Sequence, residues 1–92
     1  MMNIVDRIRM GNVDEVVLLE YVTDNDIDVA IAVAESDLAT EPILDIAAHD
    51  NDKRVRLAVV NNIHTGKETL KLLSKDADGE IATIANERIG RS

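Results

Sequence analysis

The sequence predicts an all-α protein, a short α-solenoid in which paired short helices form about three units of 26 residues. The first observation behind this prediction is that the same residue types recur at one fixed step along the chain. The second is that the apolar residues of each repeat have the spacing of a helix face. The third is a composition rich in Val, Ile, Leu and Ala with no Phe or Trp, which suits thin stacked layers. We expect residues 1–92 to form one domain.

The repeat step is 26 residues, and seven sets of three residues share it. The sets are Asp24/Asp50/Asp76, Asp26/Asp52/Asp78, Val29/Val55/Ile81, Ala32/Ala58/Ile84, Val33/Val59/Ala85, Leu18/Leu44/Leu70 and Tyr21/Ala47/Leu73. So many coincidences at a single period are hard to obtain by chance. The units predicted from them cover residues 1–23 (partial), 24–49, 50–75 and 76–92 (partial).

Each unit is expected to contain a first helix, an Asp-x-Asp turn and a second helix, followed by a loop with Pro42 or Gly66. Val55, Ala58 and Val59 stand at i, i+3 and i+4, which is the apolar stripe of one helix face. The expected helices are Met2–Met10 (ended by Gly11), Val17–Val22, Ile43–Ala48, Lys53–Asn61 and Thr69–Ser74, with further second helices at the sets that begin at Val29 and Ile81. Helices this short are marginal alone, so neighbouring units must stack and share a core.

The aspartates of the Asp-x-Asp turns have two interpretations. Around Asp24 and Asp76 their spacing imitates the ligand spacing of a calcium-binding loop. However, the position that needs glycine for the sharp turn holds Val29 or Ile81, and both belong to the apolar stripe. Helix capping is the preferred interpretation, because a carboxylate such as that of Asp52 can accept backbone N–H groups at the start of a second helix. We therefore predict no metal site.

The net charge of −8 is distributed unevenly along the chain. Residues 1–49 hold eleven acids and two bases, whereas residues 50–92 hold seven acids and eight bases. No basic side chain stands between Arg9 and Lys53. The front half is therefore expected to repel a phosphate backbone and to attract a basic partner. The alternative is that the acidity serves only to keep a small protein in solution.

From Val55 to Asn62 (VRLAVVNN), and on through Thr65, Leu70 and residues 76–78, the chain resembles a leucine-rich repeat variant unit, a HEAT-like relative. The similarity covers residues 17–89. The sequence departs from the family pattern at Ile63, where proline is usual, and only Arg56 keeps the Arg after Val. The resemblance implies a right-handed superhelix of paired short helices that serves mainly as a scaffold for protein contacts. Some relatives carry an iron–sulfur cluster on a cysteine segment, which a chain without Cys does not share.

In HEAT-like arrays the second helices often line the concave face, so the resemblance implies a partner surface on these helices. The residues expected on it are Asp28, Glu35, Arg54, Arg56, Asn61 and Glu87. Nucleic-acid binding through the basic cluster at Lys53 is an alternative. It is disfavoured because counterion release needs many phosphate contacts and because the chain has almost no aromatic side chains for stacking. The cluster is better interpreted as a solvated surface that pairs with acids of the neighbouring unit.

No constellation of residues points to catalysis, so we expect a non-enzymatic protein without cofactors. The chain has no Cys, no Gly-rich phosphate loop and no nucleophile motif, and His49 and His64 each stand alone. No stretch is long and apolar enough for a membrane span, and the N-terminus lacks the apolar core of a signal peptide, which favours the cytoplasm. The predicted function is a scaffold for protein–protein interaction with a basic partner. The alternative is a self-associating structural module that sets its acidic half against its basic half.

Overall fold

The structure is a computed structural model that describes residues 2–91. This part of the chain contains seven α-helices and no strand, which confirms the prediction of an all-helical protein. The helices are α1 (Ile4–Arg9), α2 (Glu15–Tyr21), α3 (Ile27–Glu35), α4 (Glu41–Ala47), α5 (Lys53–Asn61), α6 (Lys67–Leu73) and α7 (Gly79–Gly90).

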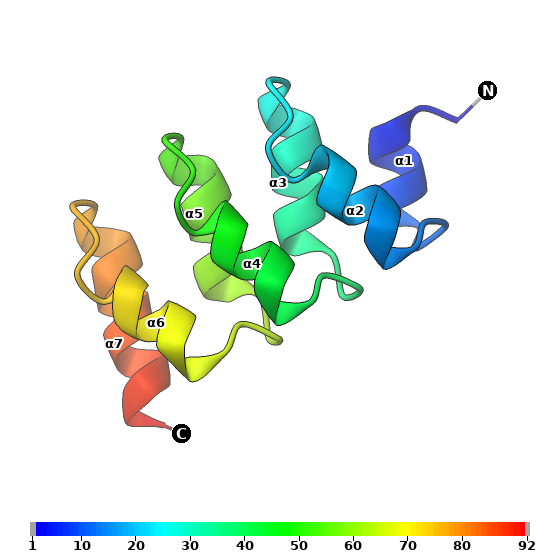
Figure 1. Cartoon of the computed structure of the whole chain (residues 1–92). Helices are drawn as coiled ribbons and strands as arrows, with labels where there is room; N and C mark the ends of the chain where they lie inside the picture. The colour runs from blue at the N-terminus through cyan, green and yellow to red at the C-terminus, as the bar shows by residue number, and fades with distance from the viewer. Residues whose placement is uncertain (1, 92) are drawn as a thin grey trace.

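The helices lie in two rows (Figure 1). The first helices α2, α4 and α6 form one row, and the second helices α1, α3, α5 and α7 form the other. Within the second row, α3 contacts α1 and α5, and α5 contacts α7. The helices α2, α4 and α6 begin at residues 15, 41 and 67, and α3, α5 and α7 begin at residues 27, 53 and 79. Both rows therefore advance by the same 26 residues, and the described chain measures 42 × 23 × 16 Å.

Aspartate pairs start the second helices α3, α5 and α7. In the middle copy the Asp50 carboxylate accepts the backbone N–H of Asp52 at 2.8 Å, which closes the turn after α4. The Asp52 carboxylate then accepts the backbone N–H of Arg54 at 2.8 Å and caps α5. The pairs Asp24/Asp26 and Asp76/Asp78 repeat this arrangement at α3 and α7. The predicted capping role of these aspartates is confirmed, and it satisfies N–H groups that no helical carbonyl can reach.

The core is a layer of small aliphatic side chains between the two rows. Leu18 and Leu44 from the first helices and Val33 and Val59 from the second helices are fully buried. They belong to the repeated sets, so successive units supply the same contacts in the same order. Because each layer is thin, burial of each helix depends on the helix that follows or precedes it.

The C-terminal ends of α3 and α5 are joined to the next second helix by side-chain donors. The side-chain amide of Asn62, just after α5, donates to the carbonyls of Ala34 at 2.9 Å and Ser36 at 3.0 Å. The Arg88 guanidinium on α7 donates to the carbonyls of Val60 at 2.7 Å and Asn62 at 2.8 Å. These carbonyls have no partner within their own helix, so the following unit completes the hydrogen bonding of the unit before it.

The predicted helix boundaries were accurate where the apolar repeat defines them. The helix Lys53–Asn61 is confirmed at both ends. The predictions Val17–Val22, Ile43–Ala48 and Thr69–Ser74 were wrong by up to two residues, because solvated residues such as Glu41 and Lys67 open these helices. The first helix begins only at Ile4, and Gly11 follows it with a φ of 73°, a left-handed conformation that suits glycine.

Candidate protein-binding surfaces

The exposed sides of α3 and α5 form an open groove of about 470 Å³. Ile31 and Leu57 provide its apolar lining, and Glu35, Arg54 and Asn61 stand along it. The structure thus brings together three of the six residues expected on a partner surface. We call the exposed side of the second helices the second-helix face.

The polar residues of the groove are already engaged with protein groups. Glu35 accepts a hydrogen bond from Arg9 at 2.9 Å. Arg54 donates to both carboxylate oxygens of its own cap, Asp52, at 3.0 and 2.7 Å. This hydrogen bonding is the main reason that the pKa of Asp52 is lowered to about 2. The same bonds raise the pKa of Arg54, and the nearby charge of Asp28 contributes further.

Arg56 lies on a different side of α5 from the groove. Its Nε donates to Asp76 at 2.9 Å, and its Nη1 donates to the carbonyls of Asp50 at 2.8 Å and Asn51 at 3.1 Å. The side chains of Arg56 and Asp76 are only 18% and 7% exposed, so this pair joins two successive turns inside the fold. We therefore leave Arg56 out of the surface proposed below. Glu87 is exposed on α7, one 26-residue step beyond Asn61.

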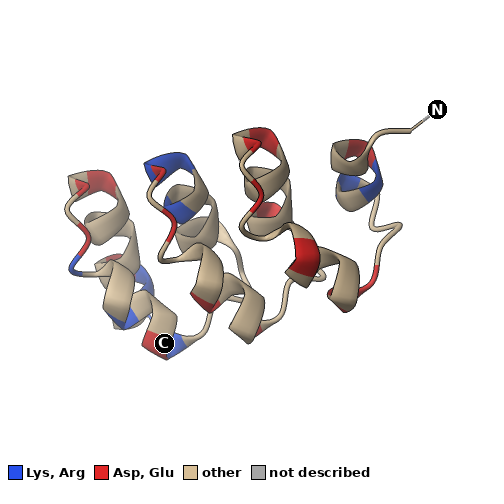
Figure 2. Cartoon of the chain, turned by 45° about the horizontal axis from the view of Figure 1, so that its top comes forward, with Lys and Arg blue, Asp and Glu red and all other residues tan. Residues whose placement is uncertain are grey.

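Charges alternate along the second-helix face (Figure 2). The equivalent positions on α3, α5 and α7 hold Asp28, Arg54 and Glu80, so an acid, a base and an acid follow one another. Lys53 adds to the basic centre and lies 3.7 Å from Asp78 of the next turn. Although the front half of the sequence is strongly acidic, this face is therefore not uniformly acidic.

The first helices present a second exposed surface, which we call the first-helix face. It consists of four exposed residues on each of α2, α4 and α6: Glu15, Val16, Leu19, Glu20, Glu41, Pro42, Asp45, Ile46, Lys67, Glu68, Lys71 and Leu72. On α2 and α4 this set contains four acids and no base, whereas α6 contributes two lysines and one glutamate. The uniform acidity expected from the sequence thus lies on α2 and α4.

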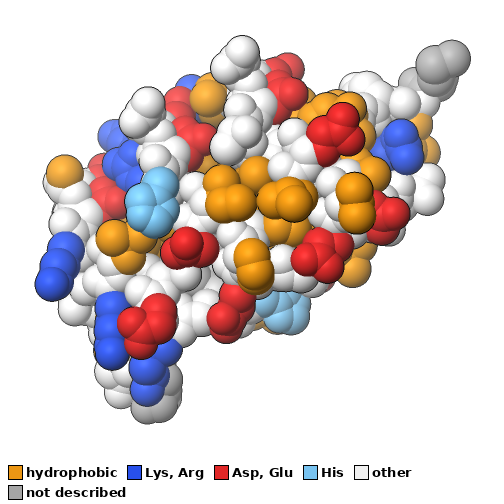
Figure 3. All heavy atoms as spheres, in the orientation of Figure 1, with side chains coloured by type: hydrophobic (Ala, Val, Ile, Leu, Met, Phe, Trp, Pro, Cys, Tyr) orange, Lys and Arg blue, Asp and Glu red, His pale blue; other side chains and the backbone are white. Residues whose placement is uncertain are grey.

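Large apolar side chains are exposed on the same face. Val16 is 73% exposed, Leu19 is 50%, Ile46 is 38% and Leu72 is 42%. In the space-filling view, hydrophobic side chains form a band over α2 and α4 with acidic side chains at its margins (Figure 3). Exposed apolar side chains that gather into a patch with a polar rim are typical of protein-binding surfaces.

Two acids of this face also interact with the next first helix. Glu15 accepts a hydrogen bond of 3.4 Å from the hydroxyl of Thr40, which precedes α4. Glu41 lies so close to Gly66, which precedes α6, that a Cβ there would overlap its carboxylate. Each carboxylate is therefore beside the positive end of the next first helix, where a negative charge is favourable.

Sequence reasoning missed the first-helix face because it followed residues that repeat. Val16 and Leu19 have no apolar counterparts on α6, where Glu68 and Lys71 occupy their positions. The signal that could have found them is their phase on the helix. Both lie outside the stripe of Leu18 and Tyr21, so a helix buried on that stripe must expose them.

The turns that precede α3 and α5 border a polar hollow lined by Asp24, Asp50, Asp52 and His49. Within residues 2–91, no group of three or more acidic or histidine side chains is arranged to hold a metal ion. None of the helices in this part of the chain is both long and apolar enough to cross a membrane. Comparison of the chain with known protein families, with curated proteins and with solved structures found no match.

Proposed function

We propose that this chain is a non-enzymatic scaffold for protein–protein interaction that binds a basic partner through α2 and α4 of the first-helix face. The observation that carries the proposal is the exposure of Val16 and Leu19, at 73% and 50%, on a surface whose charged residues are all acidic. An apolar patch with an acidic rim complements a partner that combines Lys or Arg with apolar side chains.

We also propose that the fold is a short right-handed α-solenoid of HEAT-like units, related to leucine-rich repeat variants. Three relationships that recur at 26 residues support it: the helix starts, the capping aspartates and the carbonyls bound by Asn62 and Arg88. In such an array each helix row presents one continuous surface, and a partner can contact several units at once.

The expected affinity is modest and depends on salt. The face lacks Trp and Tyr among its exposed residues, and these are the usual anchors of tight interfaces. Its acids are solvent-exposed, so added salt screens their attraction for a basic partner. Nucleic acid is disfavoured as a partner because the acidic surface repels phosphate.

A selection from displayed random short peptides tests the proposal. We expect enriched peptides to carry Lys or Arg beside apolar residues and to lose binding as ionic strength rises. The variants Leu19→Ser and Glu20→Lys should weaken binding of such a peptide, measured by fluorescence anisotropy. The matched control Glu87→Lys changes the charge equally on the second-helix face and should preserve binding.

Two results would contradict this assignment. Peptides that bind equally well to Leu19→Ser and Glu20→Lys but not to Glu87→Lys would move the site to the second-helix face. Enrichment of acidic or uncharged peptides, or binding that ignores salt, would remove the basic partner.

A further inference from the structure

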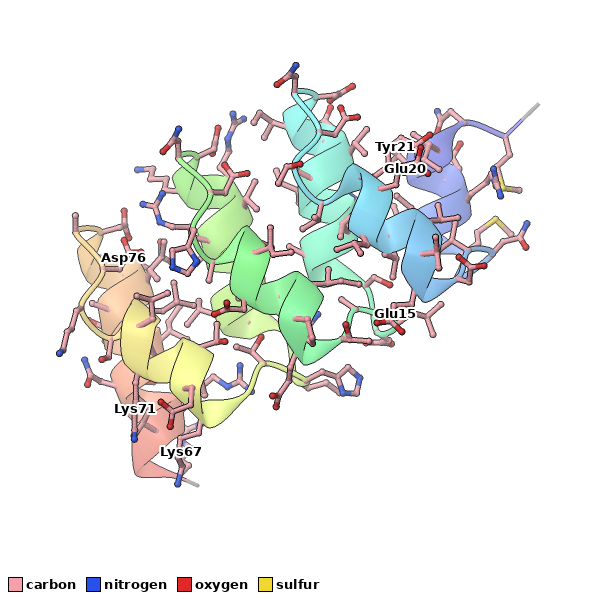
Figure 4. All side chains as sticks on the ribbon, in the orientation of Figure 1. Glu15, Glu20, Tyr21, Lys67, Lys71 and Asp76 are labelled. Atoms are coloured by element: carbon pink, nitrogen blue, oxygen red, sulfur yellow. The ribbon has the colours of Figure 1, made fainter. Side chains whose placement is uncertain are left out.

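The two ends of the first-helix face carry opposite charges. Glu20 lies on α2 at one end of the row, and Lys67 and Lys71 lie on α6 at the other end (Figure 4). Between them, α4 exposes Ile46, which is 38% exposed. A surface whose ends differ in this way is complementary to a second copy of itself turned end for end.

We propose that the partner of this face is a second copy of the chain, in a two-fold symmetric dimer whose axis runs along α4. This inference rests on the proposed function, because it names the occupant of the same surface. A two-fold axis along α4 exchanges the ends of the row, so α2 of each copy lies against α6 of the other. Such an interface is isologous, and every contact occurs twice.

The charged residues fit this arrangement. Glu20 of one copy faces the lysines of α6 in the other, so each end of the interface gains a pair of opposite charges. Lys71 interacts within its own copy only with Glu68, at 3.5 Å between two exposed side chains. That contact is weak enough to be exchanged for one across the interface.

The exposed apolar residues also fit. The same superposition places Val16 and Leu19 of one copy against α6 of the other, where Leu72 is 42% exposed. Ile46 comes close to the axis and meets its own counterpart. The four side chains that are hardest to explain on a monomer therefore become covered together.

The size of the face is sufficient for a dimer. The described chain measures 42 Å along the row and 23 Å across it. A specific interface of ordinary size covers roughly 800 Å² on each partner, which a face of these dimensions can supply. Since the anchors are aliphatic and the charges exposed, we expect a dimer that dissociates at low concentration and at high salt.

The test is a charge swap between positions 20 and 71, read by sedimentation velocity at low and high salt. The unaltered chain should form dimers at low salt. Glu20→Lys and Lys71→Glu, each alone, should weaken the dimer by about tenfold or more, because both ends then bring like charges together. An equimolar mixture of the two variants should dimerise again, since positions 20 and 71 carry opposite charges in every mixed contact.

The controls are Glu87→Lys and Lys53→Glu, which change the charge by the same amounts on the second helices and should leave the dimer unchanged. A chain that stays monomeric at low salt overturns the inference. So does a mixture of the two variants that stays monomeric, or a dimer that ignores both substitutions.

Peptide binding, measured in parallel, separates this inference from the proposed function. A monomeric chain that still binds basic peptides through Leu19 and Glu20 removes the second copy as the partner and keeps the binding function. A chain that neither dimerises nor binds such peptides removes both.

Discussion

Asn62 and Arg88, 26 residues apart, bind equivalent pairs of backbone carbonyls on the second helix that precedes each of them. The two side chains differ in length and in charge, yet both supply the N–H donors that the carbonyls need. Asn62 is 6% exposed, and its oxygen also accepts the backbone N–H of His64 at 2.8 Å. One side chain thus satisfies the end of α3 and orders the loop that follows α5.

Replacement of Asn62 tests the energetic weight of this contact. We expect Asn62→Ala to lower the free energy of unfolding by about 2 kcal/mol, because it leaves two carbonyls without a donor in a buried place. Urea denaturation measures the loss. Asn62→Asp keeps the acceptor for the His64 N–H but has no donor for the carbonyls, so it should destabilise at least as much. A stable Asn62→Asp variant would show that the donors are dispensable.

The two arginines of α5 should differ in their contribution to stability. Arg56→Ala removes the partner of the nearly buried Asp76 carboxylate, and we expect a loss of about 1 to 2 kcal/mol in urea denaturation. Arg54→Ala removes a 62% exposed guanidinium and should change stability little. Equal effects of the two substitutions would contradict the structural role given to Arg56.

The stability of the fold should fall in acid. Partial burial alone would raise the pKa of Asp76, but hydrogen bonds from Arg56 and from the Asp78 N–H outweigh it and lower that pKa. The pKa of Asp52 is also lowered, from 3.8 to about 2. Because both carboxylates hold protons less tightly when folded, their stabilisation is complete above pH 4 and is lost as the pH falls toward 2.

Denaturation by urea at a series of pH values checks this dependence. Asp76→Asn should be less stable than the unaltered chain at neutral pH and should lose less further stability on acidification. Parallel curves for the two proteins would contradict the assignment of acid sensitivity to this pair.

Two valines separate the roles of core and surface. Val59 is fully buried, and Val59→Ala should lower the free energy of unfolding by about 2 kcal/mol through lost contacts and an unfilled space. Val16 is 73% exposed, so Val16→Ala should leave stability nearly unchanged and weaken binding at the first-helix face. Urea denaturation and peptide anisotropy, measured on both variants, should give opposite patterns. Loss of stability in Val16→Ala would place that side chain in the core.

The helices could be predicted well from the sequence because burial and capping repeat. The stripe at Val55, Ala58 and Val59 identified α5, and the aspartate at position 52 marked its start. The first helices were harder to delimit, since their opening turns carry solvated residues that the apolar period does not constrain. α7 extends to Gly90 because Arg88 remains helical, whereas the equivalent Asn62 has an extended backbone and ends α5.

The candidate surface could be predicted only in part. Residues at the repeat step, such as Glu35 and Asn61, were expected to share a face, and they line the same groove. The pairing of Arg56 with Asp76 spans 20 residues and depends on how two turns approach each other, which no local pattern encodes. The first-helix face was missed because its apolar residues are those that differ between units.

The hydrogen bonds of Asn62 and Arg88 also determine how such a gene product can change its length. Each donor binds the carbonyls of the preceding second helix, so loss of residues 37–62 would leave Arg88 opposite the carbonyls of Ala34 and Ser36. Tandem duplication or deletion of 26 residues therefore preserves every donor with an acceptor. An insertion of any other length in these segments would separate them, which makes the whole unit the smallest heritable change in size that this architecture tolerates.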